Sequence, residues 1–234
     1  MKLSAALDSP DTKARYVRRL FSTIADRYDL ITVLLSYGQD RRWKRRLVSL
    51  APIRPGVRAL DLACGTGDIT FALQDHGART IGLDITLRML QIARRKRAAT
   101  PAFLAGDMMA LPFAESSVDL VTAGYGIRNV PVITSALAEI HRVLRPGGLF
   151  LSLDFNRPSN AIVRGVYLAY LTVVGSTLGF VLHGDPDTYR YIPESIRRYP
   201  GAGAVCRIAQ AQGFSACDWF PVLGGLMAIH RAVK

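Results

Sequence analysis

The central part of the chain alternates short apolar runs with amphipathic segments, and this alternation restricts the fold more than any other feature of the sequence. Strand, helix and strand in succession predict βαβ units, in which parallel strands form one sheet with helices on its faces. We therefore predict an α/β fold. The predicted strands are 57–63, 79–85, 101–107, 118–126 and 149–155, and the predicted helices are 70–77, 87–99 and 133–144.

The C-terminal part continues this pattern. Residues 204–214 are predicted to form a helix, and residues 215–233 are predicted to form two strands joined by a Gly-Gly turn. A chain of 234 residues fits one domain with a sizeable core, or one domain with a small insertion. Half of the residues are hydrophobic, which excludes global disorder.

The stretch LDLACGTGD, residues 60–68, joins the first predicted strand to a helix through glycines. Gly65 and Gly67 allow the backbone to approach a ligand where a Cβ atom would clash. Asp84 ends the second predicted strand, where a carboxylate typically holds a ribose diol, and Asp107 ends the third. The pattern predicts a nucleoside-containing cofactor at the carboxyl ends of the strands.

A nicotinamide dinucleotide fits this loop poorly for two reasons. Counting G-x-G-x-x-G from Gly65 places Thr70 where the third glycine should stand, and the acids Asp61 and Asp68 flank the loop. A pyrophosphate seeks helix N-terminal N–H groups and positive potential, so these acids would repel it. They suit a ligand that carries an ammonium and a sulfonium, and we therefore predict S-adenosylmethionine (SAM).

The net charge of +12 is concentrated near the N-terminus, where residues 1–58 include RRWKRR at 41–46. Such a patch attracts nucleic acid or anionic lipid headgroups, and a solvated helix face is the alternative.

The three cysteines form no CxxC pair, and their odd number suits a reducing cytoplasm. We predict no metal site. The N-terminus lacks the apolar region of a secretory signal, and its basic segment KARYVRRLF leaves a mitochondrial presequence as the alternative.

Several motifs together resemble the class I SAM-dependent methyltransferases: LDLACGTGD, GLDIT, GDMMALPF, VDLVTAGYGIRNV and LAEIHRVLRPGGLFLSLDF. Three further segments narrow the resemblance to the ubiquinone/menaquinone biosynthesis C-methyltransferase family. They are 21–46, GIRNV at 126–130 and GDPDTYRYIPESIRRYP at 184–200. The resemblance implies a Rossmann-like seven-stranded sheet whose last strand is antiparallel, with a helical substrate cap.

The resemblance also divides the chain and implies roles for single residues. We expect a helical cap at 1–50, a SAM-binding core at 51–156, an apolar helical insertion at 157–203 and a segment completing the core at 204–234. The expected acceptor-facing and catalytic residues are Tyr28, Arg128 and Asn129. The expected cofactor-binding residues are Asp61, Gly65, Thr66, Gly67, Asp84, Ile85, Asp107, Met108 and Gly124.

The family's reaction, as the resemblance implies, moves a methyl group from SAM to a ring carbon of a prenylated hydroquinone. We expect a naphthoquinol of the demethylmenaquinol or phylloquinone type, with a benzoquinol or a soluble aromatic compound as alternatives. No nucleic-acid substrate is expected, because neither an N/D-P-P-Y segment nor a Pro-Cys nucleophile follows the fourth strand. Phenols titrate near pH 10, so a guanidinium such as Arg128 is suited to stabilising the phenolate. The alternatives are that Arg128 pairs with Asp154 and that Tyr28 is a core aromatic.

Residues 165–182, GVYLAYLTVVGSTLGFVL, carry no charge over a length that suggests a membrane span. A single crossing would place the last two strands on the far side of the bilayer, away from their sheet. We instead expect a helix whose small or mildly polar residues pack on the domain, namely Gly165, Ala169, Thr172, Ser176 and Gly179. Its larger residues would meet a prenyl tail or the membrane. With the cations and Trp43 of 41–46, this predicts a cytoplasmic protein held peripherally on the inner face of an anionic membrane. Core burial and a homodimer interface are the alternatives.

Overall fold

A computed structural model describes residues 3, 7–97 and 101–234. Its strands form a single seven-stranded sheet in the order β3-β2-β1-β4-β5-β7-β6. Strands β1 to β5 pair in parallel, and β7 runs antiparallel to both of its neighbours, so the predicted fold and its antiparallel last strand are confirmed. The strands are β1 Arg58–Leu62, β2 Arg79–Asp84, β3 Ala102–Ala105, β4 Val118–Gly124, β5 Leu144–Phe155, β6 Ala216–Val222 and β7 Met227–Val233.

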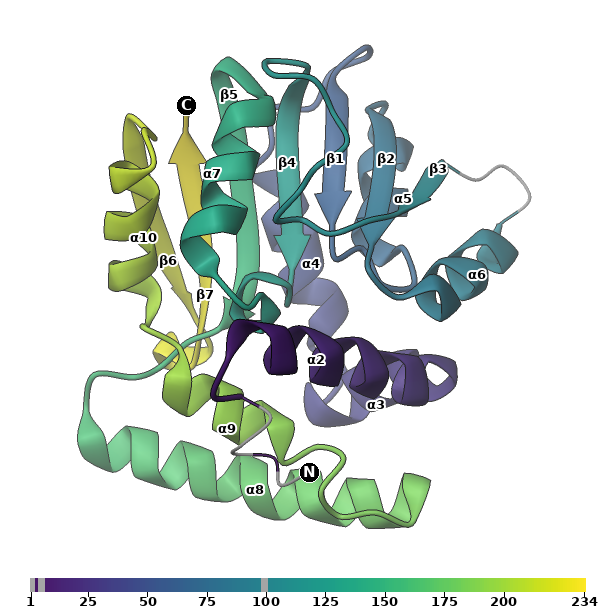
Figure 1. The fold of residues 1–234 in the computed structure, drawn as a ribbon, viewed down its shortest axis with the longest axis vertical. Helices are drawn as coiled ribbons and strands as arrows, with labels where there is room; N and C mark the ends of the chain where they lie inside the picture. Colours follow the sequence, from purple (N-terminus) through teal and green to yellow (C-terminus); the bar gives the residue numbers. More distant parts are fainter. Residues whose placement is uncertain (1–2, 4–6, 98–100) are drawn as a thin grey trace.

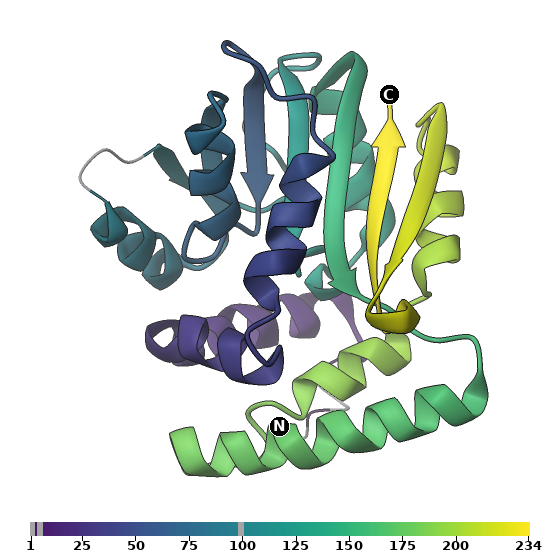
Figure 2. The ribbon, with the colours of Figure 1, turned by 180° about the vertical axis from the view of Figure 1, so that it is seen from behind.

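Helices cover both faces of the sheet and one of its ends (Figures 1 and 2). Helices α7 and α10 lie on one face, and α4 and α5 lie on the other. Helices α2, α3, α8 and α9 lie at the end toward which β1 and β4 point. The helices are α2 Pro10–Ile24, α3 Tyr28–Leu35, α4 Asp40–Ser49, α5 Asp68–Asp75, α6 Leu87–Lys96, α7 Ile133–Val143, α8 Ala161–His183, α9 Tyr191–Arg198 and α10 Ala202–Ala211, with the short turns η1 Ala25–Arg27, η2 Ile127–Asn129 and η3 Leu223–Gly225.

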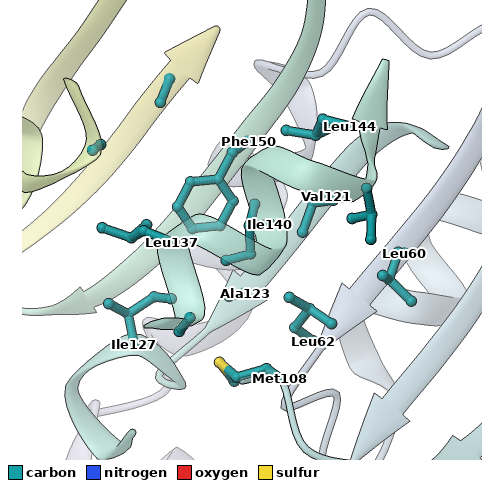
Figure 3. Close-up of a cluster of buried hydrophobic side chains, with 14 of the residues drawn as sticks. Leu60, Leu62, Met108, Val121, Ala123, Ile127, Leu137, Ile140, Leu144 and Phe150 are labelled. Atoms are coloured by element: carbon teal, nitrogen blue, oxygen red, sulfur yellow. The ribbon is translucent and has the colours of Figure 1, made fainter. Parts of the chain in front are cut away.

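The main core lies between the sheet and α7, where aliphatic side chains of the central strands meet Leu137 and Ile140 (Figure 3). β1 and β4 are buried on both faces, which explains why their sequences are continuous apolar runs rather than alternating ones. The predicted boundaries differ slightly. Helix α5 begins at Asp68 because the left-handed Gly67 caps it, and residues 98–99 of the predicted helix 87–99 lie outside the described residues.

Helix α8 is, among the described residues, the one helix long and apolar enough to cross a membrane. Strand β5, which precedes α8 in the chain, pairs with β7, which follows it, and this excludes a single crossing. The face that packs agrees with the predicted one at Gly179 only, because Gly165 and Ala169 are exposed and the two residues between them and Gly179 are half-buried. The buried face consists of larger residues followed by two glycines: Tyr167, Leu168, Leu171, Gly175 and Gly179.

Gly175 and Gly179 bring α8 close to the chain that leads back to α9. A Cβ atom on Gly179 would lie 2.5 Å from the carbonyl oxygen of Asp185, and one on Gly175 would lie 3.3 Å from that of Tyr189. Gly175 and Gly179 form a GxxxG pattern, which also occurs where helices contact each other in membranes. In this protein the pattern serves a contact within the chain.

The odd number of cysteines suggested a reducing environment, but two of the three cysteines are bonded to each other. Cys206 of α10 and Cys217 of β6 form a disulfide, and Cys64 is free and buried. Helix α10 packs directly on β6, so these two positions meet although they form no recognisable motif. The odd number of cysteines is therefore no guide to the redox state of this pair.

Candidate functional site

The site lies where the strand order reverses, between β1 and β4 at the carboxyl ends of the sheet. Open α/β sheets bind ligands at this position, because the loops on either side of the reversal diverge and leave a crevice. The glycine loop follows β1 here, with φ of 54° at Gly65 and 89° at Gly67. A side chain at position 67 would also place its Cβ atom 2.8 Å from the Phe71 ring. The loop therefore requires glycine at this position.

A cavity beside the loop contains most of the predicted cofactor residues. Asp107 and Met108 lie on its wall together with four others, Gly65, Asp84, Ile85 and Gly124. Helix α2 closes the opposite side with Ala14, Val17 and Phe21. The N-terminal helix thus forms part of the cavity that the core motifs outline.

The side chains of this cavity fit a nucleoside. The Asp84 carboxylate accepts backbone N–H groups of Gly65 at 2.8 Å and Thr86 at 2.7 Å, which fixes its position beside the loop. Burial raises the pKa of Asp84, and the two N–H groups oppose this shift. Met89 and Met108 supply apolar walls. A fixed carboxylate next to apolar walls suits a ribose diol joined to a purine, so the residues present fit SAM.

Three predicted cofactor residues do not line this cavity. Asp61 and Thr66 lie instead in a small adjoining recess, and Gly67 lines neither. The hydroxyls of Thr70 and Thr122 donate to the Asp61 carboxylate at 2.6 and 2.7 Å, and burial raises its pKa to about 6. The hydroxyl of Thr66 donates to Asp29 of α3 at 2.5 Å. These side chains brace the loop, a role that their position in the motif did not reveal.

Asp68 does not present the bare negative charge that the sequence suggested. Its carboxylate pairs with Lys44 of α4 at 2.9 Å and with Lys96 of α6 at 3.0 Å. Burial raises the pKa of Asp68, but the two lysines outweigh burial and hold the pKa at about 2. Repulsion of a pyrophosphate by Asp68 is therefore not a valid argument for the cofactor, which depends instead on the fit of the cavity.

A second, larger cavity of about 380 Å³ adjoins the first and is lined mainly by aromatic and aliphatic side chains. Its walls come from α2, α3, α8, α9 and η3. Phe21, Tyr28, Tyr125 and Asn129 line both cavities and therefore stand at the junction between them. An apolar molecule in the second cavity would meet a cofactor in the first at these residues.

Tyr28 and Asn129, which the resemblance implies face the acceptor, both lie at this junction, and they differ in their hydrogen bonds. In the described part of the chain, the Tyr28 hydroxyl has no hydrogen-bond partner, and burial raises the Tyr28 pKa to about 12. Asn129 donates to the carbonyl of Tyr125 at 2.7 Å and accepts from the Tyr191 hydroxyl at 3.0 Å. Tyr28 thus has a free polar group, whereas Asn129 holds its surroundings in place.

Arg128 is buried and forms an ion pair with Asp154, the alternative that the sequence had left open. Its backbone N–H and its Nε donate to the Asp154 carboxylate at 2.9 and 3.1 Å. Its Nη1 donates to the hydroxyl of Ser195, and the guanidinium lies 5.0 Å from the centre of the Phe155 ring. Arg128 also lines the second cavity, so the ion pair does not remove it from the cavity wall.

Tyr125 and Trp43 are site residues that sequence reasoning missed. Tyr125 has a φ of 59° and donates its hydroxyl to Asp40 at 2.7 Å, and its position between two glycines was the available signal. Trp43 was expected at a membrane interface, but it lines the second cavity. Of the 41–46 segment, Lys44 also turns inward, and the four arginines are exposed.

Comparison with known proteins agrees with this geometry. The model of the ubiE/COQ5 methyltransferase family matches residues 9–234. A demethylmenaquinone methyltransferase of Thermus thermophilus is 42% identical over 216 residues, which cover 90% of this chain and 98% of that protein. The ubiquinone/menaquinone biosynthesis C-methyltransferase UbiE of Azotobacter vinelandii is 37% identical over 230 residues, which cover 95% of this chain and 91% of that protein. The crystal structure of a SAM-dependent methyltransferase from Thermotoga maritima shares the fold, with a TM-score of 0.68 at 18% identity, covering 93% of this chain and 99% of that chain.

Proposed function

Because the chain belongs to the ubiE/COQ5 methyltransferase family, and is thus a SAM-dependent methyltransferase, we propose that it methylates a ring carbon of a prenylated naphthoquinol of the demethylmenaquinol type. The observation that carries this proposal is the apolar cavity that meets the cofactor cavity at Tyr28 and Asn129. A soluble, strongly polar acceptor would find few partners on these walls. A prenylated aromatic ring fits them.

When bound, SAM supplies an electrophilic methyl group on a positively charged sulfur. We propose that Asp84 holds its ribose and that Asp107 and Met108 lie along its adenine. Asp61, Thr66 and Gly67 hold the glycine loop, and Gly65 of this loop and Gly124 at the end of β4 line the cavity. The aromatic rings of Phe21 and Tyr28 at the junction favour a cation over their faces.

The acceptor ring must present one carbon in line with the S–CH₃ bond, and this is a task of positioning. The four junction residues limit where the ring can lie. Its hydroxyl must lose a proton, or share it, so that electron density reaches the attacking carbon. We propose that the guanidinium of Arg128 stabilises the oxygen as it becomes negative, because a guanidinium stays charged and offers several donors.

The partners of Arg128 support this role. Asp154 and Ser195 hold Nε and Nη1, and no hydrogen bond within the described residues involves Nη2. A guanidinium fixed at one edge presents its other edge in a constant orientation. The Tyr28 hydroxyl, protonated at neutral pH, is the second donor proposed for the acceptor.

We further propose that the protein docks on a membrane through α8. The outward face of this helix exposes large apolar side chains, and exposed arginines of α4 supply positive charge that suits anionic headgroups. Flotation with vesicles of an anionic phospholipid tests this proposal, with vesicles of phosphatidylcholine as the control. Dimers in sedimentation, without any co-flotation, would favour a homodimer through the same face. The large apolar side chains exposed on α8 are those of Ile162, Val163, Val166, Tyr170, Val173, Phe180 and Val181.

Mass spectrometry of the reaction product tests the proposed activity directly. The protein, SAM and chemically reduced demethylmenaquinone are incubated in detergent, alongside the corresponding demethylated benzoquinol and an unprenylated naphthol. We expect one added methyl group on the naphthoquinol. Methylation of the benzoquinol alone would identify the ubiquinone type of ring, and methylation of the naphthol alone would identify a soluble aromatic acceptor.

A further inference from the structure

The second cavity, in which we propose that the acceptor binds and which we call the acceptor cavity, reaches the protein surface at residues that do not line the cofactor cavity. Four of its lining residues are also exposed: Gln39 and three larger side chains, Tyr37 at 73%, Leu223 at 55% and Tyr170 at 38%. They come from the turn after α3, from η3 and from α8. A residue that both lines a cavity and faces solvent marks an opening, so the cavity has a mouth at this place.

A pair of tyrosines crosses this mouth. The hydroxyls of Tyr37 and Tyr170 are hydrogen-bonded to each other, which joins the turn after α3 to the middle of α8. Tyr37 has a φ of 49°, a left-handed conformation that non-glycine residues rarely adopt, so the turn itself determines where this ring points. Between exposed hydroxyls, such a bond is weak enough to open when an apolar chain displaces it.

The surface around the mouth is apolar. Leu30, Val33 and Leu34 of α3 are exposed on one side, and Val166 and Val173 of α8 are exposed on the other. The cavity itself is of a size that holds a ring and a short chain, at the lower end of the usual range of roughly 300–1,000 Å³ for ligand pockets. A long polyprenyl chain must therefore leave the protein, and this mouth leads to a surface that suits it.

We propose that Tyr37, Tyr170 and Leu223 form the port through which the isoprenoid tail of the acceptor leaves the cavity and enters the lipid bilayer. This inference rests on the proposed function, because it needs an acceptor with a tail. The ring then lies at Tyr28 and Asn129, and the first isoprene units lie between the aromatic side chains of the port. Residues of the port should affect acceptors with long tails and leave short-tailed acceptors largely unaffected.

The test compares two acceptors in detergent micelles, reduced demethylmenaquinones with one and with eight isoprene units. Tyr170→Asp places a carboxylate beside the tail, and we expect the kcat/KM for the long-tailed acceptor to fall about tenfold or more, because the carboxylate must be desolvated against apolar chain. We expect the value for the short-tailed acceptor to stay within about threefold of that of the wild type. Tyr170→Phe removes only the hydroxyl and should keep both activities.

Leu87→Asp is the matched control, since Leu87 is 55% exposed on α6 and lines neither cavity. SAM binding by each variant confirms that it is folded. An equal loss for both acceptors in Tyr170→Asp would overturn the port, because Tyr170 would then shape the ring site. The port would also be overturned if Leu87→Asp lowered the kcat/KM for the long-tailed acceptor alone, as Tyr170→Asp is expected to do. A wild-type protein that methylates neither acceptor would refute the proposed function itself.

Discussion

At the scale of a single residue, Arg128 has a structural role in its ion pair with Asp154, and the chemical role that we propose for it would depend on the same side chain. Its ion pair with Asp154 is buried, so removing the guanidinium leaves a buried carboxylate without its partner. Such a loss costs roughly 3–5 kcal/mol of folding free energy. Arg128→Lys is the sharper variant, because it keeps the positive charge and removes the planar arrangement of donors.

We expect Arg128→Lys to lower kcat by about 10²-fold, the order of loss seen when one donor to a developing oxyanion is removed. Its dissociation constant for SAM should change less than about twofold, because Arg128 does not line the cofactor cavity. Isothermal titration with SAM and single-turnover methylation measure the two quantities. Arg145→Lys, which makes the same exchange in the ion pair with Asp119 and away from both cavities, is the control. A parallel loss of SAM affinity would show that Arg128 organises the cofactor site instead.

Asp61 leads to a prediction on pH and stability. Its pKa is about 6 in the folded protein against an ordinary value of 3.8, so between these pH values the folded state binds a proton that the unfolded state has released. The titration of Asp61 therefore lowers the free energy of unfolding as the pH rises from about 4 to about 6, by at most ~1.4 kcal/mol per pH unit. Urea unfolding of wild type and Asp61→Asn at pH 4, 5, 6 and 7 measures this difference. Parallel curves for the two proteins would contradict the assignment.

At the scale of an element, two of the three glycines of α8, Gly165 and Gly179, lie in opposite surroundings. Alanine at an exposed helical position stabilises by up to about 1 kcal/mol relative to glycine. We expect this gain for Gly165→Ala, because a Cβ atom there has no neighbour within 4 Å. We expect Gly179→Ala to destabilise by about 1–3 kcal/mol, because its Cβ atom would lie 2.5 Å from a carbonyl oxygen.

Thermal or urea unfolding of the two alanine variants gives the comparison. Because both substitutions add the same methyl group to the same helix, their difference isolates the contact between α8 and the segment that follows it. Equal effects of the two variants would mean that α8 does not pack on residues 185–189 in solution.

At the scale of the whole molecule, the N-terminal helices close the site that the sheet provides. Ion pairs join them to α6, between Asp26 and Arg88 at 2.5 Å and between Asp29 and Lys96 at 2.7 Å. Lys13 of α2 donates to the carbonyls of Arg128 and Val130 at 3.2 and 2.5 Å. The wall of the cofactor cavity is therefore shared between two parts of the chain, and a ligand bound there touches both.

We expect SAM to slow amide hydrogen exchange in α2 as well as in the glycine loop, because Ala14, Val17 and Phe21 line the cofactor cavity. Exchange in α10, which contributes no residue to that cavity, should stay unchanged and serves as the internal control. Mass spectrometry of peptides with and without SAM measures both segments. Protection confined to the loop would show that α2 does not close on the cofactor.

Much of the fold was predictable because it is encoded within short segments. Apolar periodicity identifies β1, β2 and β4, and the need for left-handed backbone at Gly65 and Gly67 marks the turn that follows β1. Asp84 and Asp107 were recognisable for the same reason, since each directly follows or ends a predicted strand. Parallel strands must bring such residues to one edge of the sheet, so most of the cofactor cavity followed from local sequence.

The sequence by itself determined the sheet, the glycine loop and the carboxylate beside it. Only the tertiary structure decided which side chains meet across the site, because these contacts join segments far apart in the chain. Lys44 forms an ion pair with Asp68, and Asp154 forms one with Arg128. Asp29 accepts a hydrogen bond from the Thr66 hydroxyl. Local patterns fix backbone conformation and the buried face of each element, whereas the partner of a polar side chain depends on how distant elements pack. The packing also decided which face of α8 is buried and placed Trp43 on the wall of the second cavity.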